Sequence, residues 1–260
     1  MIWLRRAYIA YGALVFVGSF LMLFPFFWLC IKIKPLQPLT VFFNQIWCWT
    51  FFPAILMPVI TKDASRNIPE GPCVFVANHT SYLDIAMLTW ILRRFVAFVG
   101  KASILKVPLF GLYFRELHIS VDRRNAQDRN KALDMAVEKL REGRSVVFFP
   151  EGRITLDNQP LMGQFRDGAF KAAIRTGVPV VPITIAYNWY IMPDWGQFGA
   201  RWHWAYFRFH KPMPTTGLTE ATDTEALKRE CYQTIEDELT ARNPKAMAAA
   251  RAKFARLNAV

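Results

Sequence analysis

The sequence predicts an α/β domain that follows an apolar N-terminal segment. From Ile68 onward, short apolar runs alternate with amphipathic segments, as is typical of alternating strands and helices. Two of the amphipathic segments stop at a glycine, where helices commonly end. Residues 1–62 differ, because they contain no acidic residue and are rich in Phe, Trp, Leu and Ile. We therefore divide the chain into a membrane-attachment segment, residues 1–62, and a domain of catalytic size, residues 63–242.

The N-terminal segment is predicted to attach the chain to a membrane. Residues 7–31 carry no charge, and about 20 apolar residues are enough to cross a bilayer. A second uncharged stretch, residues 35–61, is interpreted as an interfacial or half-inserted helix whose Trp47 and Trp49 suit the headgroup region. A cleaved signal peptide and a buried soluble helix are the alternatives. We favour one span or a dipping helix pair.

The remaining chain is predicted to form a central sheet with helices around it. Strands are expected at residues 73–77, 95–99, 119–121, 146–149, 180–186 and 202–209, the last of them strongly aromatic. Helices are expected at residues 81–93, 127–142, 165–176 and 220–241. Residues 243–260 are expected to form a basic C-terminal tail, which from Lys245 is interpreted as an Ala-rich helix or a frayed end. Sites in such domains gather in the loops that follow strands.

The charge of the chain points to an acidic partner. Its formal net charge is +12, which suits a nucleic acid, an anionic membrane surface or a phosphorylated substrate. Its four cysteines form no CxxC pair, so neither a disulfide framework nor a zinc site is indicated and a reducing compartment is the default. The motifs GxSxG and GxxxxGK[ST] do not occur, which weakens the serine-hydrolase and P-loop interpretations.

The strongest chemical signal is the pair His79 and Asp84, five residues apart after the apolar run at residues 73–77. A histidine that titrates near neutrality can take a proton from a hydroxyl, and a carboxylate can fix its tautomer and stabilise its charged form. Ser81 lies between them, but no nucleophile-elbow motif surrounds it. A helix-start hydrogen bond is the better interpretation of this serine.

Three further motifs follow in order. A basic turn at residues 121–124 ends one predicted strand, the sequence FPEGR at residues 149–153 ends another, and VPVVPI occupies residues 178–183. Together with Asn78-His79-x4-Asp84, these motifs resemble the glycerolipid acyltransferase family, which includes 1-acylglycerol-3-phosphate acyltransferase. The resemblance covers roughly residues 68–212 and a similarly hydrophobic N-terminus.

The resemblance implies a glycerol-3-phosphate-acyltransferase-like mixed sheet flanked by helices, and a role for each motif. His79 would be the general base, and Asp84 would hold and polarise it. Arg123 would bind the acceptor's phosphate, with Lys101 as a second contact, and Glu151 and Gly152 would shape the acceptor pocket. The substrate-binding set that we carry over is Asn78, Lys101, Arg123, Glu151, Gly152, Arg153 and Pro182, with Val181 beside Pro182 in the groove. No metal is implied.

Two departures from the family pattern bear on the acceptor. The family's arginine usually stands two places after the glycine of FPEG, whereas Arg153 follows Gly152 at once. The form FPEGRIT is similar to that of acyltransferase domains that act on 2-acyl-glycerophosphoethanolamine. Leu117 and His118 also stand where the family usually has a glycine before the basic turn.

The predicted function is transfer of a fatty acyl group to the free hydroxyl of 1-acylglycerol-3-phosphate, which forms phosphatidic acid. The donor would be acyl-CoA or acyl-carrier-protein, as co-substrate and without a cofactor. Another lysolipid acceptor is the alternative, and a basic membrane adaptor is the non-enzyme alternative. The expected partners are the lysolipid, the donor and an anionic membrane, not nucleic acid. The expected place is the bacterial inner membrane, with the catalytic domain on the cytoplasmic side.

Overall fold

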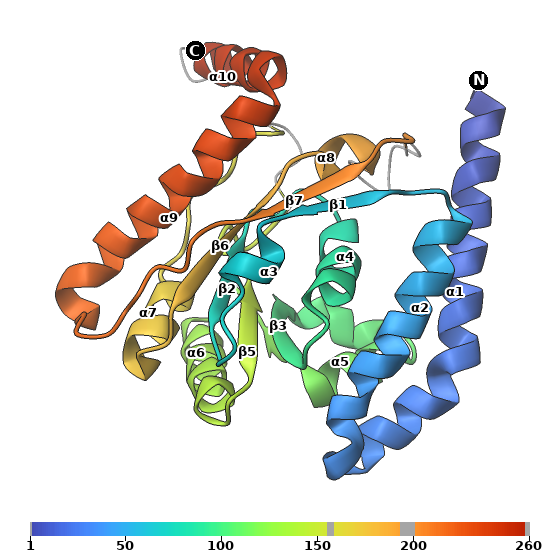
Figure 1. Ribbon diagram of the computed structural model, residues 1–260, viewed down its shortest axis with the longest axis horizontal. Helices are drawn as coiled ribbons and strands as arrows, with labels where there is room; N and C mark the ends of the chain where they lie inside the picture. The colour runs from blue at the N-terminus through green and yellow to red at the C-terminus, as the bar shows by residue number, and fades with distance from the viewer. Residues whose placement is uncertain (1, 155–158, 193–200, 258–260) are drawn as a thin grey trace.

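The computed structural model describes residues 2–154, 159–192 and 201–257. Within these residues a mixed sheet of seven strands lies between layers of helices (Figure 1). The strands are β1 (Val59–Lys62), β2 (Val74–Ala77), β3 (Val96–Lys101), β4 (Ile119–Val121), β5 (Ser145–Phe148), β6 (Val180–Ile185) and β7 (Ala205–Phe209). The order across the sheet is β1-β7-β6-β2-β5-β3-β4. This confirms the predicted fold class.

Five neighbouring strands, from β6 to β4, are parallel, and the other two are reversed. β7 pairs antiparallel with β6, and β1 pairs parallel with β7. The central strands β2, β5 and β6 are buried along their whole length, as expected for parallel strands covered on both faces. The carboxyl ends of the five parallel strands therefore share one edge, here called the catalytic edge.

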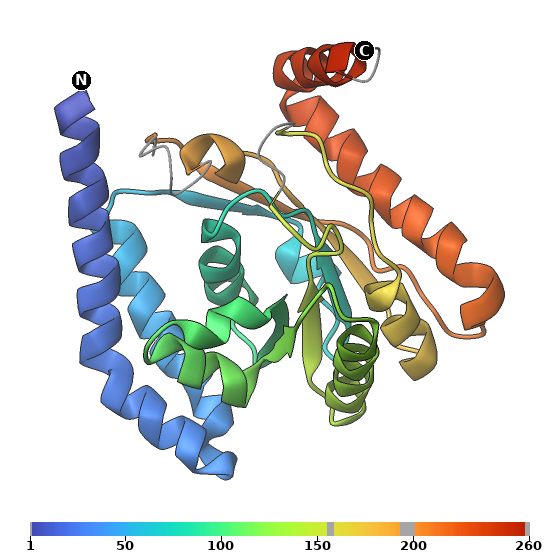
Figure 2. The ribbon, with the colours of Figure 1, turned by 180° about the vertical axis from the view of Figure 1, so that it is seen from behind.

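Each face of the sheet packs against its own set of helices (Figures 1 and 2). On one face Phe75 and Phe98 join Phe52 of α2 (Thr40–Ala54) and Met87 of α4 (Leu83–Leu92). The other face packs on α6 (Ala126–Arg141), α7 (Gly168–Thr176) and α9 (Glu220–Arg242). The shorter elements are α3 (Ala64–Asn67), η2 (Ala102–Lys106), α5 (Phe110–Leu117) and α8 (Asn188–Ile191), and α10 (Pro244–Leu257) follows α9.

The N-terminal segment folds as a helical hairpin beside the domain. Helix α1 (Ile2–Lys32) turns through η1 (Lys34–Leu39) and packs along α2. Its inner side buries Phe20 against Trp47 of α2, and Phe27 against Tyr113 of α5. Its outer side exposes Leu14 and other large apolar residues. From Arg6 to Lys32 this helix is long and apolar enough to cross a membrane.

The structure differs from the sequence predictions in two places, and a third prediction lies partly outside the described residues. Residues 59–62 form strand β1, although residues 35–61 were expected to be helical throughout. The expected strand at 202–209 begins only at Ala205, because Trp202 and Trp204 lie exposed before it. The helix expected from Lys245 is α10, but residues 258–260 lie outside the described residues. The division at residue 62 stays a prediction.

Candidate active site

The site starts at the end of β2, where the chain leaves the middle of the sheet. Asn78 extends the pairing of β2 with β6, because its Nδ2 donates to the carbonyl of Ile185 (2.9 Å) and its Oδ1 accepts from the Ile185 N–H (2.8 Å). This amide clamp fixes the backbone immediately before His79. Asn78 was predicted to contact substrate, but the contacts it makes in this structure are with β6.

His79 is held between a carboxylate and an aromatic ring. Its Nδ1 lies 2.9 Å from Oδ2 of Asp84, and its ring stacks on Phe149 with centroids 4.1 Å apart. An ionised carboxylate only accepts hydrogen bonds, so this contact favours the tautomer with its proton on Nδ1. The imidazole then presents Nε2 as its basic nitrogen. His79 keeps 9% of its surface exposed.

Asp84 is completely buried in the first turn of α4, where the helix N-terminus favours negative charge. Its Oδ2 also accepts from the backbone N–H groups of Thr80 (2.8 Å) and Ser81 (3.0 Å). Its Oδ1 accepts from Nδ2 of Asn188 (2.8 Å). With His79, four donors surround a carboxylate that would otherwise be costly to bury.

Asn188 belongs to this network and was not predicted. It lies in α8, just after β6, more than a hundred positions from Asp84 along the chain. Only its position after a predicted strand could have drawn attention to it. Ser81, in contrast, has the expected structural role: its Oγ accepts from the Leu83 N–H (3.2 Å) and donates to the Met192 carbonyl (2.9 Å).

Glu151 ties the end of β5 to the end of β2. Its Oε1 accepts from the backbone N–H of His79 (2.8 Å), and its Oε2 accepts from the Gly163 N–H (2.7 Å). Burial raises the pKa of this carboxyl to about 7, against the two backbone hydrogen bonds, which lower it. Glu151 therefore positions the backbone of the candidate base.

Arg166 lies beside Gly152, and its charge acts on Arg123. Gly152 has a φ of +73°, and a Cβ there would lie 3.1 Å from Nε of Arg166, so glycine allows both the turn and the close approach. Burial and the neighbouring Arg166 together lower the pKa of Arg123. Arg123 is fixed by its turn, whose Asn125 caps α6 through the Gln127 N–H (2.8 Å). Two arginines whose charges act on each other in this way could together bind an anion.

The other predicted substrate residues take no part in the contacts described so far. Lys101 ends β3 with an exposed side chain, and Arg153 is also exposed. Pro182 is buried within β6. Strand alternation places Pro182 on the face of Val180, whereas His79 follows the opposite face. The structure does not bring Pro182 to the histidine.

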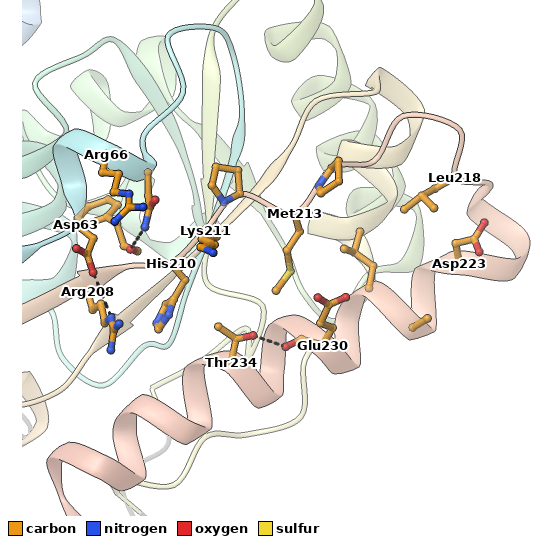
Figure 3. Close-up of a pocket in the computed structure, with 16 residues that line it drawn as sticks. Asp63, Arg66, Arg208, His210, Lys211, Met213, Leu218, Asp223, Glu230 and Thr234 are labelled. Carbon is orange, nitrogen blue, oxygen red and sulfur yellow. Dashed lines mark hydrogen bonds and ion pairs between the residues drawn. The ribbon is translucent and has the colours of Figure 1, made fainter.

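A separate cavity of about 780 Å³ lies at the opposite edge of the sheet (Figure 3). It opens between α9 and the end of β7, and its lining includes Arg66, Lys211 and Glu230. Part of its charge is already paired, since Arg208 lies 3.5 Å from Asp63. Because β7 runs antiparallel to β6, this cavity is remote from His79.

The fold and the site define a class of protein: an α/β domain with a histidine–carboxylate base at one sheet edge and an arginine anion site beside it. Residues 59–186 match the Acyltransferase family. The fold of the 1-acyl-sn-glycerophosphate acyltransferase from Thermotoga maritima superposes with a TM-score of 0.73 at 22% identity, covering 93% of this chain and 99% of that one.

Curated relatives are named as acyltransferases too. A 1-acyl-sn-glycerol-3-phosphate acyltransferase of Chlamydomonas reinhardtii is 32% identical over 76% of this chain and 62% of its own length. Its namesake in Escherichia coli is 32% identical over 45% of this chain and 47% of its own. The chain thus spans less than two thirds of these relatives. The matched family, the shared fold and these relatives together confirm the resemblance to the glycerolipid acyltransferase family that the motifs predicted.

Proposed function

We propose that this protein is an O-acyltransferase that acylates the free hydroxyl of 1-acylglycerol-3-phosphate. The observation that carries the proposal is the buried His79–Asp84 pair at the catalytic edge. Nε2 of His79 removes the hydroxyl proton, and the oxygen attacks the thioester carbonyl carbon of the donor. The carbon–sulfur bond then breaks, and the departing thiolate takes a proton from the imidazolium. The products are phosphatidic acid and the free thiol of the donor.

The acceptor's phosphate would lie between Arg123 and Arg166. Phosphate matches the planar guanidinium fork, and an anion relieves the repulsion between these two cations. We prefer this pair to Arg153, which the family resemblance suggested, because Arg166 packs against Gly152 and its charge adds to burial in lowering the pKa of Arg123. A lysolipid with another phosphate-bearing headgroup is the second candidate acceptor, because the motif FPEGRIT is similar to that of domains that act on 2-acyl-glycerophosphoethanolamine.

We also propose that the enzyme works at a membrane, through α1 and α2. The outer face of this hairpin exposes Leu14, Met22 and Trp49, and residues 1–62 carry no acidic side chain. The bacterial inner membrane, with the catalytic domain on the cytoplasmic side, is the location proposed. The proposal needs no metal or cofactor. Acyl-CoA and acyl-carrier-protein both remain candidate donors.

A substrate panel tests the reaction. Membranes that contain the protein are offered several lysolipids with acyl-CoA or acyl-carrier-protein, and the products are identified by mass. We expect phosphatidic acid from 1-acylglycerol-3-phosphate, and none from a folded His79→Ala variant, which lacks the base. Near-normal turnover by this variant would contradict the proposal.

Steady-state kinetics test the phosphate site. We expect Arg166→Ala and Arg123→Ala each to raise the KM for the acceptor by about tenfold or more, since each removes a charge-assisted hydrogen bond. Arg153→Ala is the matched control and should change this KM little. If Arg153→Ala raised the acceptor KM and Arg166→Ala did not, the phosphate would be placed wrongly.

A further inference from the structure

A cluster of exposed and half-buried side chains, aromatic or apolar except for one arginine, lies at the catalytic edge, outside the reaction site. We call it the aromatic rim. Its members are Leu56, Tyr190, Arg201, Trp202, His203 and Trp204. Leu56 exposes 75% of its surface, Trp202 60% and Trp204 44%. Folding gains little from side chains left this exposed, so they call for another explanation.

We propose that the aromatic rim is a second membrane-contact surface, continuous with the hairpin and resting on the lipid headgroup region beside the site. The inference builds on the proposed function, because it assumes an enzyme that meets its acceptor in a bilayer. Tryptophan and tyrosine favour the membrane interface, where one end of the ring is apolar and the other is wet. None of the six residues is acidic.

Hydrogen bonds join the rim to the hairpin. Nε1 of Trp202 donates to the carbonyl of Leu56 (2.7 Å) at the end of α2. Tyr8 of α1 donates to the next carbonyl back, that of Ile55 (2.7 Å), and Tyr11 donates to Ala54 (3.2 Å). The end of α2 is therefore bonded both to α1 and to Trp202, so the rim adjoins the hairpin. This continuity is why we choose a bilayer as the occupant.

The backbone at Leu56 gives an independent argument. Leu56 has a φ of +53°, and its N–H bonds to Pro53 O (2.9 Å) while Met57 N–H bonds to Phe52 O (3.1 Å). This is a Schellman ending, at which glycine is usual and a leucine is strained. The side chain of Leu56 points outward, so packing within the protein does not offset the backbone strain. Burial of this side chain in lipid would offset it.

The rim is also coupled to the reaction site. His203 packs on Tyr187 with ring centroids 4.7 Å apart, just after β6. The backbone N–H of Arg201 donates to the Ile191 carbonyl (2.8 Å) at the end of α8, the helix that holds Asn188. Lipid bound at the rim would therefore lie next to the elements that position Asp84. The acceptor would reach the base along a lipid surface.

A spin label tests the contact directly. All four native cysteines are buried, so a nitroxide attached to Leu56→Cys labels that position selectively. The full chain is placed in vesicles of phosphatidylethanolamine and phosphatidylglycerol. We expect the label to meet dissolved oxygen more readily than a water-soluble nickel complex. The control is Met135→Cys on α6, an exposed position on the other face of the sheet, which should favour nickel.

Two results would overturn the inference. Equal nickel access at positions 56 and 135 would place the rim in water. Shielding from both reagents together with spin–spin broadening would indicate a second copy of the chain on the rim.

Kinetics separate this inference from the proposed function. For Leu56→Gly we expect an unchanged or higher melting temperature, and an acceptor KM in vesicles raised about tenfold through lost apolar contact. Its turnover of a short-chain, water-soluble lysophosphatidate should be unchanged. Trp204→Ala should show the same two kinetic effects. An unchanged acceptor KM in vesicles for both variants would contradict the membrane contact of the rim but not the proposed function. A parent protein that is inactive on both acceptors would contradict the proposed function but not the membrane contact.

Discussion

Asp84 accepts four hydrogen bonds, and only the one from Asn188 comes from a side chain other than that of the candidate base. The two backbone donors follow from the turn into α4. The amide of Asn188 reaches Asp84 across the sheet edge, and it stabilises the negative charge that orients His79. Asn188 is therefore a positioning residue, which acts through Asp84.

Replacing Asn188 tests this role. In Asn188→Ala, the carboxylate of Asp84 loses one hydrogen-bond donor. Its negative charge is then less neutralised by that donor and stabilises the imidazolium of His79 more strongly. We expect kcat to fall about tenfold and the acid limb of the pH–rate profile to move to higher pH. A structural role alone would lower the melting temperature and leave this limb in place. Partial recovery of the parent profile in Asn188→Ser, which keeps a donor, would support positioning.

Glu151 makes the stability of the fold depend on pH. Its pKa is about 7 in the folded protein, above its ordinary value of 4.5, so the folded chain binds the proton more tightly than the unfolded chain does. The stability that this proton contributes is fully present below pH 4.5 and is lost as the pH rises through about 7. The unfolding free energy should fall across this window, and Glu151→Gln should flatten the change. Chemical denaturation at several pH values measures it, and an unaltered slope in the variant would contradict the assignment.

At the scale of elements, η2 and α5 depend on a single close approach. A Cβ on Gly111 would lie 2.3 Å from the carbonyl oxygen of Leu105, a backbone atom that cannot swing away. We expect Gly111→Ala to lower the unfolding free energy by about 1–3 kcal/mol. Gly71→Ala is the control, because a Cβ there meets nothing within 4 Å. Equal melting temperatures for the two variants would show that η2 can move aside.

The elements that the sequence predicted well are those with a strong local pattern. Strands β2 to β6 are apolar runs, and α6 and α9 are long amphipathic helices, so each was expected within a few residues. β1 was missed because its four residues are identified only by pairing with β7, far along the chain. Arg166 and Asn188 were missed for the same reason, since their partners lie across the sheet edge. The aromatic residues at 202–204 imitate the alternation of a buried strand although both indoles are exposed.

At the scale of the whole molecule, the hairpin and the domain share one core. Phe52 and Cys48 of α2 belong to the same buried cluster as Phe75 and Phe98 of the sheet. We therefore expect a chain that starts at residue 63 to expose this cluster and to aggregate, because it loses α2 as well as β1. Size-exclusion chromatography beside the full chain in the same detergent would measure this. A monomeric fragment with a cooperative melt would show instead that the predicted boundary separates two independent units.

The pairing of β1 with β7 also sets a sequence of events during synthesis. β1 lies at the edge of the sheet and borders only β7, so its hydrogen bonds wait until more than half of the chain has followed it from the ribosome. The apolar hairpin emerges before β1. Until β7 has been synthesised, its inner side is not covered by the completed sheet. A bilayer beside the ribosome would shelter it, and the nascent chain would then begin to fold at the surface where the finished enzyme is proposed to work.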